Sequence, residues 1–244
     1  MPTGYVVWEG PSRWDTTPIG LILTLRSENT ATGDVVQSWI LPRDVKPSQA
    51  VKGGQDEGVC GTCNLRPRLG GDCYVNCVHG ADPVWGKWRR GGYPAGLPPH
   101  VPDLRIGAWG DPAMVPLRVW EKLLKRTGKW NGYTHRWKDI GREYRFCMAS
   151  TETEQEYWQA KELGFRSFRV RDKGDPILPG EIPCLKSLEW ELMGNRRILC
   201  QECHLCQGNR KKKDVGIIRH GARVKADKGF NYLVKRSLVL VGRT

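Results

Sequence analysis

Cysteine is the residue type whose spacing in this sequence points most directly to chemistry. The 244 residues include nine cysteines, and eight of them fall into two groups. The first group lies within residues 60–77 and comprises Cys60, Cys63, Cys73 and Cys77. Its C-x2-C pair has the spacing with which two thiolates bind one metal ion, and nearby glycines let the backbone fold tightly around it. We therefore predict a metal or iron–sulfur site here, with Cys73 and Cys77 as the candidate partner ligands.

The second group lies far downstream and comprises Cys184, Cys200, Cys203 and Cys206. This pattern is typical of a closed zinc site or an auxiliary cluster that fastens the end of the chain, with His204 as a spare ligand. Cys147, inside a predicted strand, is interpreted as a core residue.

Disulfides are the alternative for both groups, but they need an oxidising compartment. The opening residues do not read as a signal peptide, so we expect reduced thiols and a cytoplasmic location.

The first group allows two chemistries. A [4Fe-4S] cluster held by three cysteines leaves its fourth iron open to bind a small molecule, whereas structural zinc uses four thiols and leaves no reactive position. The role of Cys77 distinguishes the two chemistries. If Cys77 is a fourth ligand, a structural site is favoured, and if Cys77 does not bind the metal, a catalytic site is favoured.

Positive charge is concentrated near the end of the sequence. The formal net charge is +13, and residues 208–244 contribute +9 of it, with eleven Lys or Arg against two Asp. The candidate nucleic-acid-binding residues are Arg210, Lys211, Lys212, Lys213 and Arg219. A polyanion such as nucleic acid would bind there, and a solvated charged tail is the alternative. No apolar run approaches the length of a membrane span, so we expect no membrane association.

The hydrophobic pattern predicts an α/β fold. Residues 5–8, 19–25 and 35–41 read as strands, with a hairpin over 19–41 because Gly33 and Asp34 favour a turn. From residue 104 strands alternate with helices, which implies a parallel sheet. The predicted strands cover 104–109, 130–134, 144–150 and 165–170, and the predicted helices cover 114–126 and the segment from a Thr151–Glu154 capping box to Gly164.

Polar residues follow several of these strands. They are Gly110-Asp111, Tyr133-Thr134-His135 and Ser150-Thr151-Glu152. Because ligands bind at the carboxyl ends of parallel strands, we expect them to share one edge with the first cysteine group. His135 could act as a general acid or base there, and a plain hydrogen-bonded histidine is the alternative.

Several motifs follow one another between residues 30 and 208. They are Thr32-Gly33-Asp34-Val35-Val36-Gln37, the cysteine loop with its Cys73-Tyr74 end, Arg105 to Pro112 ending in Gly-Asp-Pro, Gly132-Tyr133-Thr134, and the closing cysteines. In this order the chain resembles radical S-adenosylmethionine enzymes, and it is more similar still to uncharacterised phage-encoded cysteine-rich proteins with the same outline. A phage origin would place the protein in the cytoplasm of a host cell.

The resemblance implies a partial (β/α) barrel in which Cys60, Cys63 and Cys73 bind a [4Fe-4S] cluster. It implies that Gly110, Asp111 and Pro112 bind the methionine amine of S-adenosylmethionine, and that Ser150, Thr151 or Glu152 faces the ribose. The usual C-x3-C-x2-C loop is replaced here by C-x2-C-x9-C. For Asp111, capping of a helix ahead of Pro112 is the alternative.

Together these patterns predict N-terminal strands over 1–57, a barrel-like core with both cysteine groups over 58–207, and a basic extension over 208–244. The first functional hypothesis is an iron–sulfur, radical S-adenosylmethionine enzyme acting on nucleic acid or a nucleotide. The rival is a non-catalytic zinc protein that binds DNA or RNA. A metal-free nuclease ranks third, because no carboxylate cluster stands out.

Overall fold

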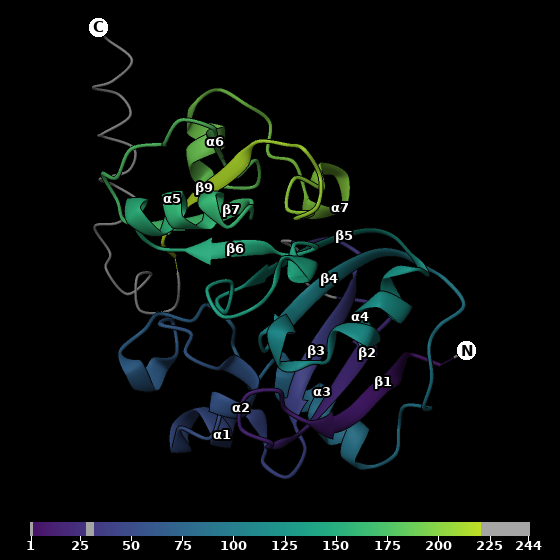
Figure 1. Cartoon of the computed structure of the whole chain (residues 1–244). Helices are drawn as coiled ribbons and strands as arrows, with labels where there is room; N and C mark the ends of the chain where they lie inside the picture. The colour runs from purple at the N-terminus through teal and green to yellow at the C-terminus, as the bar shows by residue number, and fades with distance from the viewer. Residues whose placement is uncertain (1, 28–31, 221–244) are drawn as a thin grey trace, which may run out of the picture.

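One mixed sheet organises the residues described by the computed structural model, which are 2–27 and 32–220. The strand order is β1-β2-β3-β4-β5-β6-β7-β9-β8, and the sheet does not close into a barrel (Figure 1). The strands are β1 (Gly4–Pro11), β2 (Pro18–Thr24), β3 (Val36–Pro42), β4 (Val101–Trp109), β5 (Thr127–Thr134), β6 (Met148–Thr151), β7 (Ser167–Arg171), β8 (Glu181–Pro183) and β9 (Asp214–Ile218).

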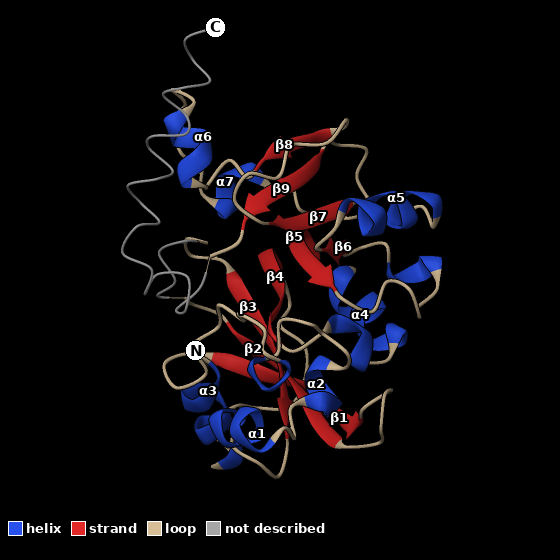
Figure 2. Ribbon diagram, turned by 90° about the vertical axis from the view of Figure 1, so that its left-hand side faces the viewer, coloured by secondary structure: helices blue, strands red, loops and turns tan. Residues whose placement is uncertain are grey.

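The helices are short, and they lie on different sides of the sheet. Figure 2 shows α4 and α5 on one side of the strands and α6 and α7 on the other. The α-helices are α1 (Pro47–Gly53), α2 (Glu57–Cys60), α3 (Ala81–Arg89), α4 (Leu117–Leu124), α5 (Glu154–Glu162), α6 (Leu188–Leu192) and α7 (Cys200–Cys203). Three 3-10 turns, η1 (Pro67–Leu69), η2 (Pro112–Met114) and η3 (Arg142–Tyr144), complete the described helical segments.

The antiparallel start of the sheet confirms the predicted hairpin. β2 pairs antiparallel with β3, and β1 adds a further antiparallel strand on the outer side of β2. Leu21, Ile22 and Leu23 in β2 are fully buried, because both faces of this strand are covered. Residues 28–31, between β2 and the predicted turn, lie outside the described residues.

From β3 onwards every strand pair is parallel, as predicted. Strands β3 to β7 lie side by side in chain order, so their carboxyl ends meet at one edge of the sheet. After β3, the first cysteine group begins at Cys60, the last residue of α2, and the Gly110-Asp111-Pro112 turn follows β4. The fold therefore brings the predicted site segments to the same edge.

Two predictions near β6 were wrong in detail. The predicted strand over 144–150 starts only at Met148, and Tyr144 ends η3 instead. The apolar pattern there reflects burial rather than extension, because the rings of Tyr144 and Phe146 pack together in the core with centroids 5.6 Å apart.

The helix that follows begins two residues later than predicted. Thr153 caps α5 by accepting a hydrogen bond from the Glu156 amide at 3.1 Å, and a Glu156 carboxylate oxygen accepts from the Glu152 amide at 2.8 Å. Thr151 belongs to β6, and its hydroxyl bonds the Ser167 hydroxyl at 2.8 Å. Gly164, with φ of 79°, follows the last turn of α5 as expected.

Strands β8 and β9 had no counterpart in the sequence prediction. β9 pairs with both β7 and β8, so residues 214–218 of the predicted basic extension form part of the central sheet. The sheet likewise crosses the predicted boundary at residue 57, since β3 and β4 are neighbours. Residues 221–244 of the extension lie outside the described residues.

Candidate functional site

The first cysteine loop is held in place by a buried arginine within it. The Arg66 guanidinium donates to Asp56 Oδ1 at 2.7 Å and to the carbonyl oxygens of Gly61 and Gly54 at 2.9 and 3.2 Å. Its side chain is 6% exposed. Arg66 thus fixes the turn that follows α2, where Cys60 ends the helix.

The structure brings Cys60, Cys63 and Cys73 together. Burial raises the pKa of the Cys60 thiol well above its ordinary value, and the nearby Cys63 and Cys73 thiols raise it further. Burial likewise raises the pKa of Cys77 to about 12, with Cys73 as the next contributor. Three of the thiols are therefore neighbours, and Cys77 lies on the Cys73 side of the group.

The second cysteine group is also gathered, on the side of the sheet that carries α6 and α7. Burial raises the pKa of Cys206, and Cys184, Cys200 and Cys203 are all close enough to raise it further. The Tyr133 hydroxyl, at the carboxyl end of β5, is close enough to the Cys206 sulfur to lower the pKa of that thiol, against burial, which raises it. All nine cysteines are described, and no disulfide joins them.

Backbone amides lie close to sulfur atoms in both groups. Burial raises the pKa of four thiols, and the amide two residues later opposes that rise: Leu65 at Cys63, Val75 at Cys73, Lys186 at Cys184 and Leu205 at Cys203. An amide N–H close to sulfur favours the thiolate form, and hydrogen bonds to sulfur are a feature of metal–thiolate and cluster loops. The donor set, soft thiolates with amide support, therefore fits zinc or an iron–sulfur cluster by type.

In neither cysteine group are the described thiols arranged around a single point. Within residues 2–27 and 32–220, no three His, Cys, Asp or Glu side chains are arranged to hold a metal ion as they stand. Rotation about the Cα–Cβ bond moves a sulfur without moving the backbone.

Arg166 supports the second group from the start of β7. Its guanidinium donates to the carbonyl oxygens of Leu205 at 2.7 Å and Gln207 at 2.9 Å, and also to those of Lys212 and Lys213. This one side chain therefore fixes the backbone on both sides of Cys206. Sequence reasoning missed Arg166, because a single arginine before a strand carries no signal of this role.

His204 does not join the second group as a ligand. It has a left-handed backbone with φ of 49°, and its Nε2 lies 2.7 Å from Asp103 Oδ1 on β4. Its Nδ1 lies 3.3 Å from the Glu202 carbonyl oxygen. Both ring nitrogens are thus engaged away from the thiols, and His204 ties α7 to the sheet.

Asp111 joins the carboxyl ends of β4 and β5. Its Oδ1 accepts hydrogen bonds from the Ala113 amide at 2.9 Å and the Thr134 hydroxyl at 2.8 Å, and its Oδ2 accepts from the His135 amide at 2.7 Å. The bond to Ala113 caps η2, as the alternative interpretation of Asp111 predicts. Burial raises the pKa of the Asp111 carboxyl, and the neighbouring His135 opposes that rise.

The turn before Asp111 requires a glycine. Gly110 has φ of 85°, and a Cβ there would lie 2.6 Å from the Ile40 carbonyl oxygen. His135 is half-buried, and the loss of water around it lowers the pKa of its imidazole, while Asp111 and Glu152 raise it. The structure thus places His135 beside Asp111 and Glu152, a setting that leaves it with a neutral imidazole near neutral pH.

Glu152 lies beside the first cysteine group. Burial raises the pKa of the Cys63 thiol to about 12, and both Asp111 and Glu152 are close enough to add to that rise. Glu152 also lines a polar pocket of about 360 Å³. The residues lining this pocket are Asn64, Lys138, Glu152, Thr153, Gln155, Glu156 and Gln159. Of the three predicted ribose-facing residues, only Glu152 lines it. Ser150 and Thr151 are buried in β6.

The predicted nucleic-acid-binding residues separate into two kinds. Arg210, Lys211, Lys212 and Lys213 are exposed in the loop before β9. Arg219 instead lies between carboxylates at the sheet edge, 3.1 Å from Glu152 and 2.9 Å from Asp172. The first four are thus available to a polyanion, whereas the charge of Arg219 is already matched.

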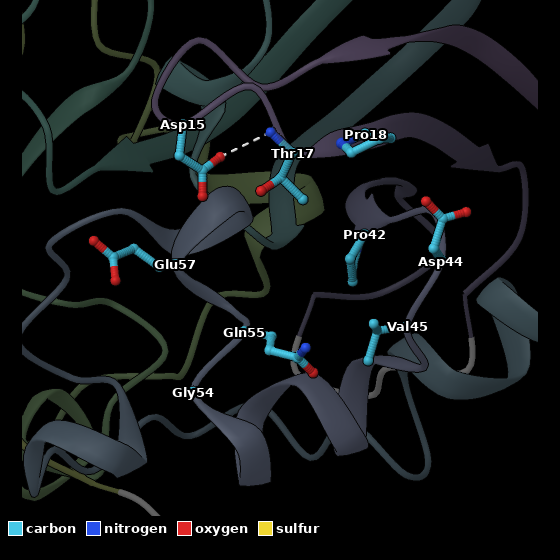
Figure 3. A pocket seen from close by; sticks show the side chains of 9 residues that line it. All are labelled: Asp15, Thr17, Pro18, Pro42, Asp44, Val45, Gly54, Gln55 and Glu57. Carbon is cyan, nitrogen blue, oxygen red and sulfur yellow. Dashed lines mark hydrogen bonds between the residues drawn. The ribbon is translucent and has the colours of Figure 1, made fainter.

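A second pocket lies away from these residues, between the end of β3 and the start of α2 (Figure 3). It has a volume of about 330 Å³, and its lining includes three exposed acidic residues, Asp15, Asp44 and Glu57. Asp15 Oδ1 accepts a hydrogen bond from the Thr17 amide at 3.0 Å. No residue of the predicted sites lines this pocket.

No protein-family model matches the chain, and the comparisons with curated proteins and with solved structures return no match. The resemblance to radical S-adenosylmethionine enzymes therefore stays a prediction. Within the described residues, no helix has the length and apolar character needed to span a membrane.

Proposed function

We propose that the protein is an iron–sulfur enzyme that binds S-adenosylmethionine and acts on nucleic acid or a nucleotide. One observation carries the proposal: Asn64, which directly follows Cys63, lines a polar pocket together with Glu152 at the end of β6. The Asp111 amide also donates to the Val59 carbonyl oxygen at 2.7 Å, just before Cys60, so the first cysteine group adjoins both this pocket and the carboxyl edge of the sheet. In parallel sheets this edge is where ligands bind and react. A purely structural metal site needs neither of these neighbours.

The order of the segments supports the proposal. The cysteine loop follows the first strand of the parallel part, Gly110-Asp111-Pro112 follows the second, and Glu152 follows the fourth. The resemblance to radical S-adenosylmethionine enzymes implies the same order along the chain: the cluster loop first, then the amine site, then the ribose site. The sheet is open, which agrees with a partial rather than a closed barrel.

Cys60, Cys63 and Cys73 would hold the cluster, as the resemblance implies. Burial raises the pKa of the Cys60 thiol, and Cys63 and Cys73 are both close enough to add to that rise. A reduced cluster bound there would supply an electron to the sulfonium group of S-adenosylmethionine. Cys77 would remain a bystander beside Cys73, leaving one position open.

The pocket beside Cys63 is where we place the ribose. The side chains of Glu152, Asn64 and Gln155 line it and can accept or donate hydrogen bonds to sugar hydroxyls. Asp111 departs from the role that the resemblance implies, because its carboxylate oxygens accept three bonds from the protein itself. We assign Asp111 to positioning the strand ends.

The exposed cations of the loop before β9 would hold the polyanionic substrate, since counterion release from phosphate gives sequence-independent affinity. The second cysteine group would be a closed centre that fixes this loop, because Lys212 lies close enough to Cys203 to lower the pKa of that thiol, whose burial raises it.

A zinc protein that binds DNA or RNA without catalysis is the second candidate. The amides that lie close to the sulfur atoms favour zinc as much as iron, because both metals take thiolate ligands. In that case all four thiols of each group would be ligands and the pocket beside Cys63 would have no role.

The deciding experiment is anaerobic purification followed by measurement of iron, sulfide and zinc per chain, with the visible spectrum. Iron and sulfide, together with reductive cleavage of added S-adenosylmethionine, would support the enzyme. Two zinc ions per chain and no iron would reject it in favour of the zinc protein. Iron and sulfide without cleavage of S-adenosylmethionine by the reduced protein would also reject the proposed activity.

A further inference from the structure

Exposed cations lie at the amino edge of the sheet, where its parallel strands start. Lys122 is near the end of α4, Lys125 caps that helix, and Lys129 lies near the start of β5. The exposed residues 210–213, all Arg or Lys, directly precede β9. Because β5, β6, β7 and β9 pair in parallel, both segments lie at the edge opposite the one that carries the first cysteine group.

The sequence of α4 fixes which of its faces meets the solvent. Val119, Trp120 and Leu123 are buried in the core. Lys122 and Lys125 are three positions apart, so they lie one above the other on the opposite, exposed face. The buried face thus holds these two lysines at fixed backbone positions beside the start of β5.

The three lysines of α4 and β5 lack carboxylate partners, and so do the cations before β9. Among residues 2–27 and 32–220, no Asp or Glu oxygen lies within ion-pair distance of any of them. Other exposed lysines are matched: Lys138 and Lys161 lie 2.8 and 2.7 Å from carboxylate oxygens. The amino edge therefore carries positive charge that the described residues do not neutralise, which attracts a polyanion.

The segment that leads into β9 connects the two sets of cations along this edge. It starts at His204, whose Nε2 lies 2.7 Å from Asp103, and Asp103 is the register partner of Lys129. The Gly208 amide donates at 3.1 Å to a carbonyl oxygen just before β6. The last residues of the segment are bound by Arg166, just before β7. The segment thus follows the strand starts from β4 to β7, and its cations continue the row that begins on α4.

We propose that Lys122, Lys125 and Lys129 extend the cations before β9 into one surface that binds the phosphate backbone of nucleic acid along the amino edge. The inference rests on the nucleic-acid binding of the proposed function, and it adds new residues and a location. Three strand spacings, at least about 14 Å, separate β5 from β9. Cations spread over this width suit repeated phosphates, whereas a small anion needs polar groups that converge on one point.

The location separates binding from reaction. Nucleotides held at the amino edge lie across the sheet from the first cysteine group and from the pocket that Glu152 lines. The surface therefore anchors a nucleic acid through its backbone, and the reacting nucleotide belongs to another part of the same molecule.

Salt titration of nucleic-acid binding by the full chain tests the proposal. The probes are a fluorescent DNA duplex of about 20 base pairs and its single strand, and they distinguish the two forms that phosphate backbone can take. We expect Lys125→Gln/Lys129→Gln to lower the slope of log affinity against log salt by about 2 on the duplex, or by about 1.4 on the single strand. Residues 221–244 are the same in every variant, so their cations contribute equally.

Lys52→Gln/Lys173→Gln is the matched control. It removes the same charge from two exposed lysines in segments that follow the carboxyl ends of β3 and β7. We expect it to leave the salt slope unchanged, because these lysines lie away from the amino edge. All four positions are exposed, so both double variants should fold as the wild type does.

Three results would overturn the inference. A wild-type slope in Lys125→Gln/Lys129→Gln would remove α4 and β5 from the surface and leave the nucleic-acid binding of the proposed function standing. An equal fall in both double variants would show attraction to net charge and not to one edge. Binding of neither probe by the wild type would overturn the inference together with the nucleic-acid part of the proposed function, whereas metal analysis decides the iron–sulfur part separately.

Discussion

The carboxylate of Asp111 accepts the hydroxyl of Thr134 at 2.8 Å, and this bond joins the ends of two parallel strands beside the first cysteine group. The same carboxylate accepts the amides of Ala113 and His135. The residue that sequence similarity suggests for cofactor binding thus has its hydrogen bonds inside the protein. The Asp111 carboxylate therefore acts on the geometry of the sheet edge, because its bonds hold the ends of β4 and β5 together.

Asp111→Ala should therefore be a stability variant. It leaves three buried donors without acceptors, so we expect the free energy of unfolding to fall by about 2–4 kcal/mol. Thr134→Val, the comparison variant, removes one of those bonds and also the bond that the Thr134 hydroxyl accepts from the Arg136 amide at 3.0 Å, so it should cost about 1–2 kcal/mol. Denaturant titration of both variants measures this, and an Asp111→Ala protein as stable as the wild type would contradict the bonding described.

Cys73→Ser and Cys77→Ser should differ in their effect on the first centre. Cys73 is a neighbour of both Cys60 and Cys63, whereas Cys77 adjoins the group through Cys73. We expect Cys73→Ser to lose the iron of the first centre and Cys77→Ser to keep it. Iron and sulfide analysis after anaerobic reconstitution measures this, and equal loss in both variants would assign four ligands to the centre.

Acid should release metal from both groups. Burial raises the pKa of Cys63 to about 12 and that of Cys184 to about 11, so both thiols carry protons at neutral pH when metal-free. Metal binding must displace these protons, so affinity rises with pH and is lost as pH falls, by about tenfold per pH unit for each thiol that ionises. Chelator competition at about pH 6.5 and about pH 7.5 measures this slope. A metal affinity independent of pH would argue against thiolate ligands.

Replacing Lys211, Lys212 and Lys213 together with Gln should weaken nucleic-acid binding and flatten its salt dependence. The slope of log affinity against log salt should fall by about 2–3 if all three contact phosphate. Arg219→Gln is the control: its ion pairs with Glu152 and Asp172 make it a stability variant with nearly unchanged affinity. Binding curves at several salt concentrations separate these outcomes, and a salt-independent affinity would rule the loop out.

Arg166→Met should release the second centre selectively. The guanidinium of Arg166 donates to four carbonyl oxygens around Cys206, and methionine can replace none of these bonds. We expect metal loss from the second centre and retention at the first, read out by metal analysis of Arg166→Met beside Cys184→Ser. Full metal content in Arg166→Met would show that the thiols alone hold the loop.

The fold was predictable where hydrophobic alternation and local turn signals agree. The antiparallel start, strands β4, β5 and β7 and the closure of α5 at Gly164 follow from such local patterns. β9 was not predictable, because its five residues follow four cations, and their role depends on pairing with β7 and β8. Long-range pairing of this kind leaves no periodic trace in a short strand.

The candidate site was predictable as a list of thiols but not as an arrangement. Spacing alone placed Cys60 beside Cys63, and it could not show that Glu152, more than eighty residues away, would lie next to them. Arg166 carried no signal, because a lone arginine before a strand reads as a surface residue. Burial, which only the fold supplies, brings Arg166 to the four carbonyl oxygens that it bonds around Cys206.

The place of β9 in the sheet sets an order for biosynthesis. β9 lies between β7 and β8, so neither neighbour has its full set of partners until the ribosome has made residue 218. All four thiols of the second group leave the ribosome before that strand, whereas their backbone support, including the carbonyl oxygens of Lys212 and Lys213, comes at the end. The first group can be assembled on a nascent chain, and the second is completed only when synthesis of the described part is nearly finished.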